Sequence, residues 1–117
     1  MDKTTLDRVT AQTRLLMAAP SCSQEARQAA QDWLDALGTD REAAQTQAYL
    51  RELEEDLVTV DQLIAFAQSA AGRQVFGPEA DSVAAHGRAL KEAGARFCDC
   101  PACQAAAAIL TETGRLR

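Results

Sequence analysis

The sequence is poor in the residues that build sheets and tight turns. Its 117 residues include three phenylalanines, one tryptophan, one tyrosine, six glycines and three prolines. β-branched residues are sparse and alanine is the commonest residue type, which disfavours strands and favours helices that pack closely through small side chains. The length suits a single domain with a modest core. We therefore predict an all-α fold, a compact bundle of five or six short helices in one domain over residues 1–117.

The chain also lacks a cluster of basic residues. Its formal net charge is −5, and no aromatic side chains alternate with lysine or arginine. Nucleic acid and anionic membrane surfaces select positively charged patches, so neither is expected as a partner. The N-terminal segment MDKTTLDRVT does not have the pattern of a signal peptide, and no apolar run approaches the length of a membrane span. These features predict a cytoplasmic protein.

Motifs of the common enzyme classes are missing as well. The sequence has no glycine-rich phosphate loop, no GxSxG, no HExxH and no helical ExxH pair. Its many carboxylates fall on helix faces expected to be exposed, where nothing indicates a catalytic pair. A non-enzymatic protein is therefore the favoured interpretation.

Four cysteines are the chemically distinctive residues. Three of them lie in the segment FCDCPAC, as Cys98, Cys100 and Cys103, and the fourth is Cys22. In a reducing compartment, cysteines at such short spacing indicate metal binding or redox chemistry rather than structural disulfides. Closed zinc and iron–sulfur sites commonly use four thiolates. We predict a metal site formed by Cys22, Cys98, Cys100 and Cys103.

Both cysteine-bearing segments are predicted to begin helices. Pro101 suits the first position of a helix, so Cys100 or Asp99 is expected to be the cap. Free N–H groups and the helix dipole would favour thiolates there. Cys22 lies in a similar segment, PSCS, and we predict that the site joins this first interhelical turn to the start of the last helix. The single histidine, His86, is an alternative ligand in a Cys3His site.

The remaining pattern predicts the helix boundaries. A first helix capped by Thr4 or Thr5 ends before Pro20, and a second runs from Ser21 or Ser23 to Gly38 with Trp33 as its largest core residue. Capping boxes, Thr39 with Glu42 and Thr59 with Gln62, begin a third and a fourth helix, and Tyr49 is expected at the edge of the third. The fourth helix fades toward Gly72, and GRQVFGPE is predicted to be a loop. A fifth helix runs from Pro78 to Gly94 and a sixth from Pro101 to Gly114.

Three segments carry a resemblance to a known family. With APSCS near the N-terminus, WLDALGT in the second helix and FCDCPAC before AAAAIL, nearly the whole sequence resembles a family of small, all-helical, four-cysteine bacterial proteins common in anaerobes. Its members are often labelled as relatives of the ninety-kilodalton heat-shock chaperone. Such a chaperone needs an ATP-binding α/β sandwich with glycine-rich loops, which this chain is too short and too glycine-poor to contain. The resemblance implies the same four cysteines and leaves the function open.

Three classes of function follow. The first is a zinc-binding protein with a structural or regulatory role, with an iron–sulfur cluster as the alternative cofactor. The second is a thiol-redox protein or redox sensor that uses the CxCPxC segment. The third is a helical interaction module with incidental cysteines, which would bind a protein partner or form a homodimer.

Overall fold

The fold is built from short helices. The computed structural model describes residues 1–116, in which the α-helices are α1 (Lys3–Ala18), α2 (Gln24–Ala36), α3 (Glu42–Asp56), α4 (Val60–Gln68), α5 (Ala70–Phe76), α6 (Ala80–Glu92) and α7 (Pro101–Glu112). A 3-10 turn covers Gly77–Glu79. Extended pairing within this range is limited to one antiparallel bridge between Thr59 and Phe97. The predicted all-α fold of short helices is confirmed.

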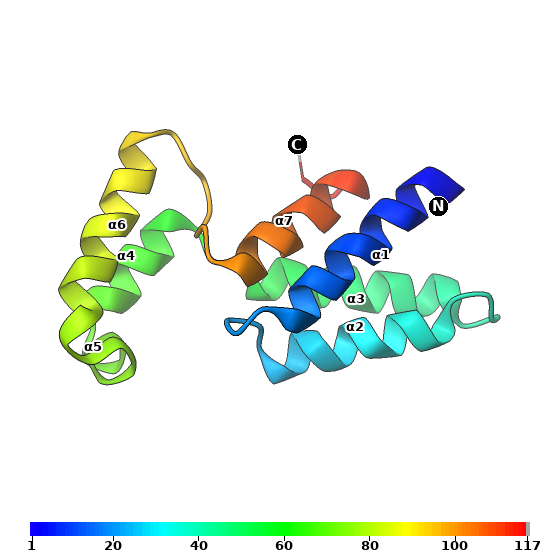
Figure 1. The fold of residues 1–117 in the computed structure, drawn as a ribbon, viewed down its shortest axis with the longest axis horizontal. Coiled ribbons are helices and arrows are strands. Elements are labelled where there is room, and N and C mark those ends of the chain that lie inside the picture. The colour runs from blue at the N-terminus through cyan, green and yellow to red at the C-terminus, as the bar shows by residue number, and fades with distance from the viewer. Residues whose placement is uncertain (117) are drawn as a thin grey trace. The chain divides into compact units, whose positions relative to one another are not determined.

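The chain folds into two compact units (Figure 1). Unit 1 contains residues 1–57 and the segment from Asp99 onward, and unit 2 contains residues 58–98. The prediction of one helical domain over residues 1–117 stays a prediction. None of the helices described combines the length and the apolar composition needed to cross a membrane.

Unit 1 pairs α1 with α7 and α2 with α3 (Figure 1). An ion pair of 3.7 Å between Arg8, near the start of α1, and Glu112, at the end of α7, shows that these two helices are antiparallel. At their other ends, the Ala102 N–H donates to the Ser21 hydroxyl over 3.2 Å. The turn between α1 and α2 therefore lies beside the first turn of α7.

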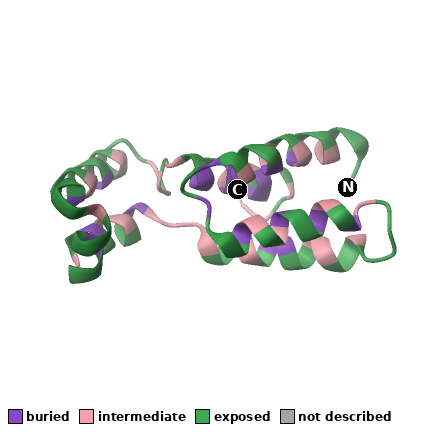
Figure 2. Cartoon of the chain, turned by 60° about the horizontal axis from the view of Figure 1, so that its bottom comes forward, coloured by how far each residue is buried: buried purple, intermediate pink, exposed green. Residues whose placement is uncertain are grey.

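Buried side chains of α1, α2, α3 and α7 form the core of unit 1 (Figure 2). Trp33 is fully buried, as predicted for the largest core residue, and its Nε1–H donates to the Thr46 hydroxyl over 3.0 Å. The expectation that Tyr49 lies at the edge of its helix is wrong. Tyr49 is 1% exposed because its hydroxyl has a buried partner, Thr13 on α1, at 2.8 Å.

The helix ends of unit 1 follow the sequence signals in part. Ser23 caps α2, as predicted, by accepting the Ala26 N–H over 3.0 Å. Asp2 caps α1, so the assignment to Thr4 or Thr5 is wrong, because the carboxylate of Asp2 already accepts the Thr5 N–H.

The predicted capping box of Thr39 with Glu42 does not form, because α3 begins at Glu42 itself, after Arg41. The two side chains stabilise the preceding turn instead. The Thr39 hydroxyl accepts the Arg41 N–H over 3.2 Å, and Glu42 accepts the N–H of Gly38 over 2.8 Å. Gly38 has a φ of 79°, which is the left-handed conformation expected of a glycine after a helix.

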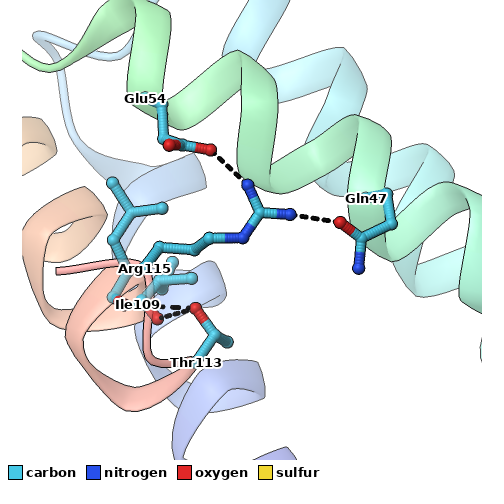
Figure 3. A network of polar contacts seen from close by, with 6 residues as sticks. Gln47, Glu54, Ile109, Thr113 and Arg115 are labelled. Carbon is cyan, nitrogen blue, oxygen red and sulfur yellow. Dashed lines mark hydrogen bonds and ion pairs between the residues drawn. The ribbon is translucent and has the colours of Figure 1, made fainter.

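The segment after α7 is held against α3 by one arginine (Figure 3). The Arg115 guanidinium donates to Glu54 over 2.5 Å and also to Gln47, so its two terminal nitrogens contact residues two turns apart on α3. The Thr113 hydroxyl donates to the Ile109 carbonyl over 2.9 Å. These contacts fix the end of α7 on the bundle.

Unit 2 is organised around the packing of α4 on α6. The predicted capping box of Thr59 and Gln62 is confirmed at the start of α4. Gly87 on α6 allows the close approach, because a Cβ added there would lie 2.8 Å from Cγ1 of Ile64. This agrees with the expectation that small residues bring the helices together.

The predicted loop over GRQVFGPE is wrong, because α5 and the 3-10 turn occupy most of it. Ser69 begins α5 by accepting the Gly72 N–H over 3.0 Å. Gly72 is buried within α5, at a position with no room for a side chain. A Cβ added to it would lie 1.8 Å from the carbonyl oxygen of Phe66, which is a backbone atom that cannot rotate away.

We expect Gly72→Ala to destabilise unit 2 by about 1 to 3 kcal/mol, as other overpacking substitutions do. Alanine gains helix propensity of about 1 kcal/mol over glycine, but the clash with the Phe66 carbonyl forces α4 and α5 apart. Denaturant unfolding followed by circular dichroism measures the change. The control is Gln74→Ala on the exposed side of α5. A Gly72→Ala protein as stable as this control would contradict the close packing.

Candidate metal centre

The start of α7 presents two of the cysteines. Cys100 is the N-cap, with extended backbone angles (φ −63°, ψ 155°), and Pro101 occupies the first helical position. This confirms the predicted helix opening and selects Cys100 over Asp99 as the cap. The Cys103 N–H donates to the Cys100 sulfur over 3.4 Å, so the sulfur takes the role that a serine oxygen plays at an ordinary cap. A backbone N–H at this position stabilises a thiolate.

Cys98 is placed by a short extended pairing within unit 2. Its N–H donates to the Val58 carbonyl over 2.8 Å, and the Val60 N–H donates to the Arg96 carbonyl over 3.0 Å. Thr59 and Phe97 form the bridge between these two hydrogen bonds. The pairing thus fixes the backbone of Cys98 within unit 2.

The three sulfurs of Cys98, Cys100 and Cys103 all lie within 4.8 Å of one another. Tetrahedral coordination with Zn–S bonds of 2.3 Å places neighbouring sulfurs roughly 3.8 Å apart. The observed separations thus exceed the coordinated value by about 1 Å at most, a change that side-chain rotation can supply. Cys103 is buried and the other two are half-buried. Three clustered thiols of this kind can hold a metal ion.

Cys22 is not a member of that group of three. It is 8% exposed, and its thiol donates to the Ser23 carbonyl over 3.4 Å. Burial raises the pKa of the Cys22 thiol, the Asp56 carboxylate raises it further, and the positive charge of Arg27 acts in the opposite direction. Cys22 belongs to the same hydrophobic cluster as Ala102, in the first turn of α7. The four-cysteine ligand set stays a prediction.

His86, the alternative ligand, is exposed on α6 and is not a member of the sulfur group. His86 lies between Val83 and Leu90 in the sequence of α6. These two residues are half-buried, whereas His86 is on the exposed side of the helix. A Cys3His site that includes His86 gains no support from this arrangement.

The contacts of two residues near Cys22 were not expected from the sequence. Arg27 donates to three carbonyls around the turn, and Ser21 accepts the Ala102 N–H. Arg27 had a detectable signal, because a positive charge near the start of a helix is unfavourable to the dipole and indicates another partner. Ser21 had none, since its partner lies 81 residues away.

Tyr49 belongs to the same buried hydrophobic cluster as Cys22. Burial raises the pKa of the Tyr49 phenol to about 12, against the opposing effect of the hydrogen bond to Thr13. Its ring lies 5.4 Å from that of Trp33, centroid to centroid. Cys22 thus shares its buried cluster with a pair of uncharged aromatic side chains.

Comparison with models of protein families, with curated proteins and with solved structures found no match for this chain. The resemblance to four-cysteine bacterial proteins accordingly stays a prediction.

Proposed function

We propose that this protein binds one metal ion through the thiolates of Cys98, Cys100 and Cys103, with Cys22 as the fourth ligand. The observation that carries the proposal is the grouping of three sulfurs within 4.8 Å of one another. Thiolates at this density repel one another unless a cation is shared between them. The proposed role of the ion is structural or regulatory, without catalysis.

Zinc is the proposed ion. Structural zinc sites are closed and tetrahedral, and four thiolates are a common ligand set for them. Four thiolates around Zn²⁺ leave a net charge of −2, which needs compensation from nearby donors. The N–H groups at the start of α7 and the Arg27 guanidinium near Cys22 are of the right sign. An iron–sulfur cluster on the same cysteines is the alternative, because such clusters also take four thiolate ligands.

As a structural element, the ion would link the turn between α1 and α2 to the start of α7. These two segments already share the hydrogen bond between Ser21 and Ala102. A metal that binds the folded protein and not the unfolded chain adds its binding free energy to stability. Loss of the ion would then loosen unit 1 at this end, which is how a regulatory role would operate.

A thiol-redox function is the second candidate, favoured by one specific contact. The Cys100 sulfur accepts the Cys103 N–H, which lowers the cost of a thiolate at Cys100, and thiolates are the attacking species in disulfide exchange. This function predicts rapid alkylation of a single thiol in the isolated protein. The metal site predicts slow alkylation of all ligand thiols together until a chelator is added.

Elemental analysis combined with a thiol count on anaerobically purified protein tests the proposal. We expect close to one zinc per chain, and a chelator should release it together with a rise in reactive thiols. Iron with visible colour would identify the cluster instead. Metal-free protein with one fast thiol would favour the redox function. If replacing all four cysteines with serine changes neither the melting temperature nor helicity, the cysteines are incidental to an interaction module.

A further inference from the structure

Arg27 reaches backward from α2 to the turn that carries Cys22. Its Nε donates to the Met17 carbonyl over 3.1 Å, and one Nη donates to the carbonyls of Ala19 and Cys22 over 3.3 and 3.4 Å. The side chain is half-buried. One guanidinium thus contacts the backbone on both sides of the turn between α1 and α2.

These carbonyls explain why a positive charge is tolerated at this position. Met17 and Ala19 lie at the end of α1, where the last carbonyls have no partner within the helix and carry the negative end of its dipole. The guanidinium satisfies these carbonyls, which offsets its unfavourable position near the start of α2. The third carbonyl belongs to Cys22 itself, so the same contact sets the backbone orientation of the cysteine.

A second contact sets where the turn lies. Pro101 has no N–H, the Cys103 N–H goes to the Cys100 sulfur, and the remaining N–H in the first turn of α7, that of Ala102, goes to the Ser21 hydroxyl. Ser21 therefore fixes the turn against α7. Arg27 then determines how Cys22 is presented within that turn.

We infer that Arg27 is the positioning residue for Cys22, holding its backbone so that the thiol is available as the fourth metal ligand; the inference rests on the proposed metal site. Arginine is suited to this role because its planar fork donates in several fixed directions at once. Lysine keeps the positive charge, but its three N–H donors are all on one nitrogen, so it cannot reproduce contacts made from both Nε and Nη.

The variant Arg27→Lys separates this role from a general contribution of charge. In the metal-free protein we expect Cys22 to be alkylated about tenfold faster, since lysine cannot keep all of the charge-assisted hydrogen bonds to the turn. Peptide mass spectrometry should show no comparable change at Cys98, Cys100 or Cys103. With Co²⁺ as the probe, the thiolate-to-cobalt absorption of Arg27→Lys should fall to the level of Cys22→Ser.

The matched control is Arg14→Lys, at an exposed arginine on α1, and it should leave both measurements unchanged. A wild-type spectrum without thiolate-to-cobalt absorption would overturn the proposed function and the inference with it. A wild-type-like spectrum in Arg27→Lys, beside a reduced one in Cys22→Ser, would overturn the inference alone. The inference is also overturned if Cys22→Ser keeps the full cobalt absorption. It is likewise overturned if Arg27→Lys accelerates alkylation equally at all four cysteines, or if Arg27→Lys loses helicity.

Discussion

Replacing Cys100 with serine is expected to weaken metal binding by at least about a hundredfold, since outer-shell changes alone often cost tenfold to a hundredfold. A serine hydroxyl stays protonated near neutral pH and is a poor ligand for ions that select thiolates. The metal-free protein should be as stable as the wild type or slightly more stable. Cys100 caps α7 by accepting the Cys103 N–H, and serine is among the most favourable residues at that position.

A metal ligand is expected to show weaker metal binding without any loss of stability in the metal-free protein, which distinguishes it from a residue needed for packing. Zinc affinity by competition with a chromophoric chelator, and the melting temperature with and without metal, measure the two effects separately. Gln104→Ala, at an exposed position four residues into α7, is the control and should match the wild type in affinity. If Cys100→Ser binds zinc as the wild type does, Cys100 is not a ligand. If it instead unfolds without metal, the cysteine has a packing role that the cap geometry does not explain.

The second large effect is expected from Trp33→Ala, which should reduce the free energy of unfolding by about 3 to 5 kcal/mol. The indole is fully buried, packs beside the Tyr49 ring and donates to Thr46. Its removal leaves a cavity in the middle of unit 1, together with the loss of one aromatic contact and one hydrogen bond. Small proteins have roughly 5 to 15 kcal/mol in total, so the remaining margin is narrow.

Chemical denaturation monitored by circular dichroism measures this loss. Leu15→Ala removes another large apolar side chain, but Leu15 is 60% exposed on α1, so its stability should stay within about 0.5 kcal/mol of the wild type. Equal stabilities of the two variants would mean that Trp33 does not anchor the core.

The features that were predicted correctly are those determined by neighbours in sequence. The opening of α7 follows from a proline directly after Cys100, and the grouping of Cys98 with Cys100 and Cys103 follows from six consecutive residues. The capping box at Thr59 is equally local. Helical periodicity was enough to assign Trp33 to the core, because alanines and leucines repeat on the same face of α2.

The errors and omissions arise from contacts between different helices or across turns, which the periodicity of a single helix does not predict. Tyr49 can be buried because its hydroxyl is hydrogen-bonded to the hydroxyl of Thr13, which lies on another helix. The fourth helix was expected to fade toward Gly72, whereas α4 ends at Gln68 and Gly72 lies within α5, packed closely against the Phe66 carbonyl. The carbonyls that Arg27 contacts lie only five to ten residues before it, but the turn between α1 and α2 has to form before one guanidinium can reach all three. Whether Cys22 joins the other cysteines depends on the same kind of long-range arrangement.

The extended pairing at the ends of unit 2 has a consequence for how the whole chain folds. Because Val58 and Cys98 are hydrogen-bonded to each other, unit 2 begins and ends at nearly the same point once it has formed. An intact unit 2 then acts as a short tether between α3 and α7, however many residues it contains. The entropic cost of bringing α3 and α7 together is then that of closing a short loop. We therefore expect α7 to pack on α1 and α3 faster than it would after a flexible connection of the same number of residues.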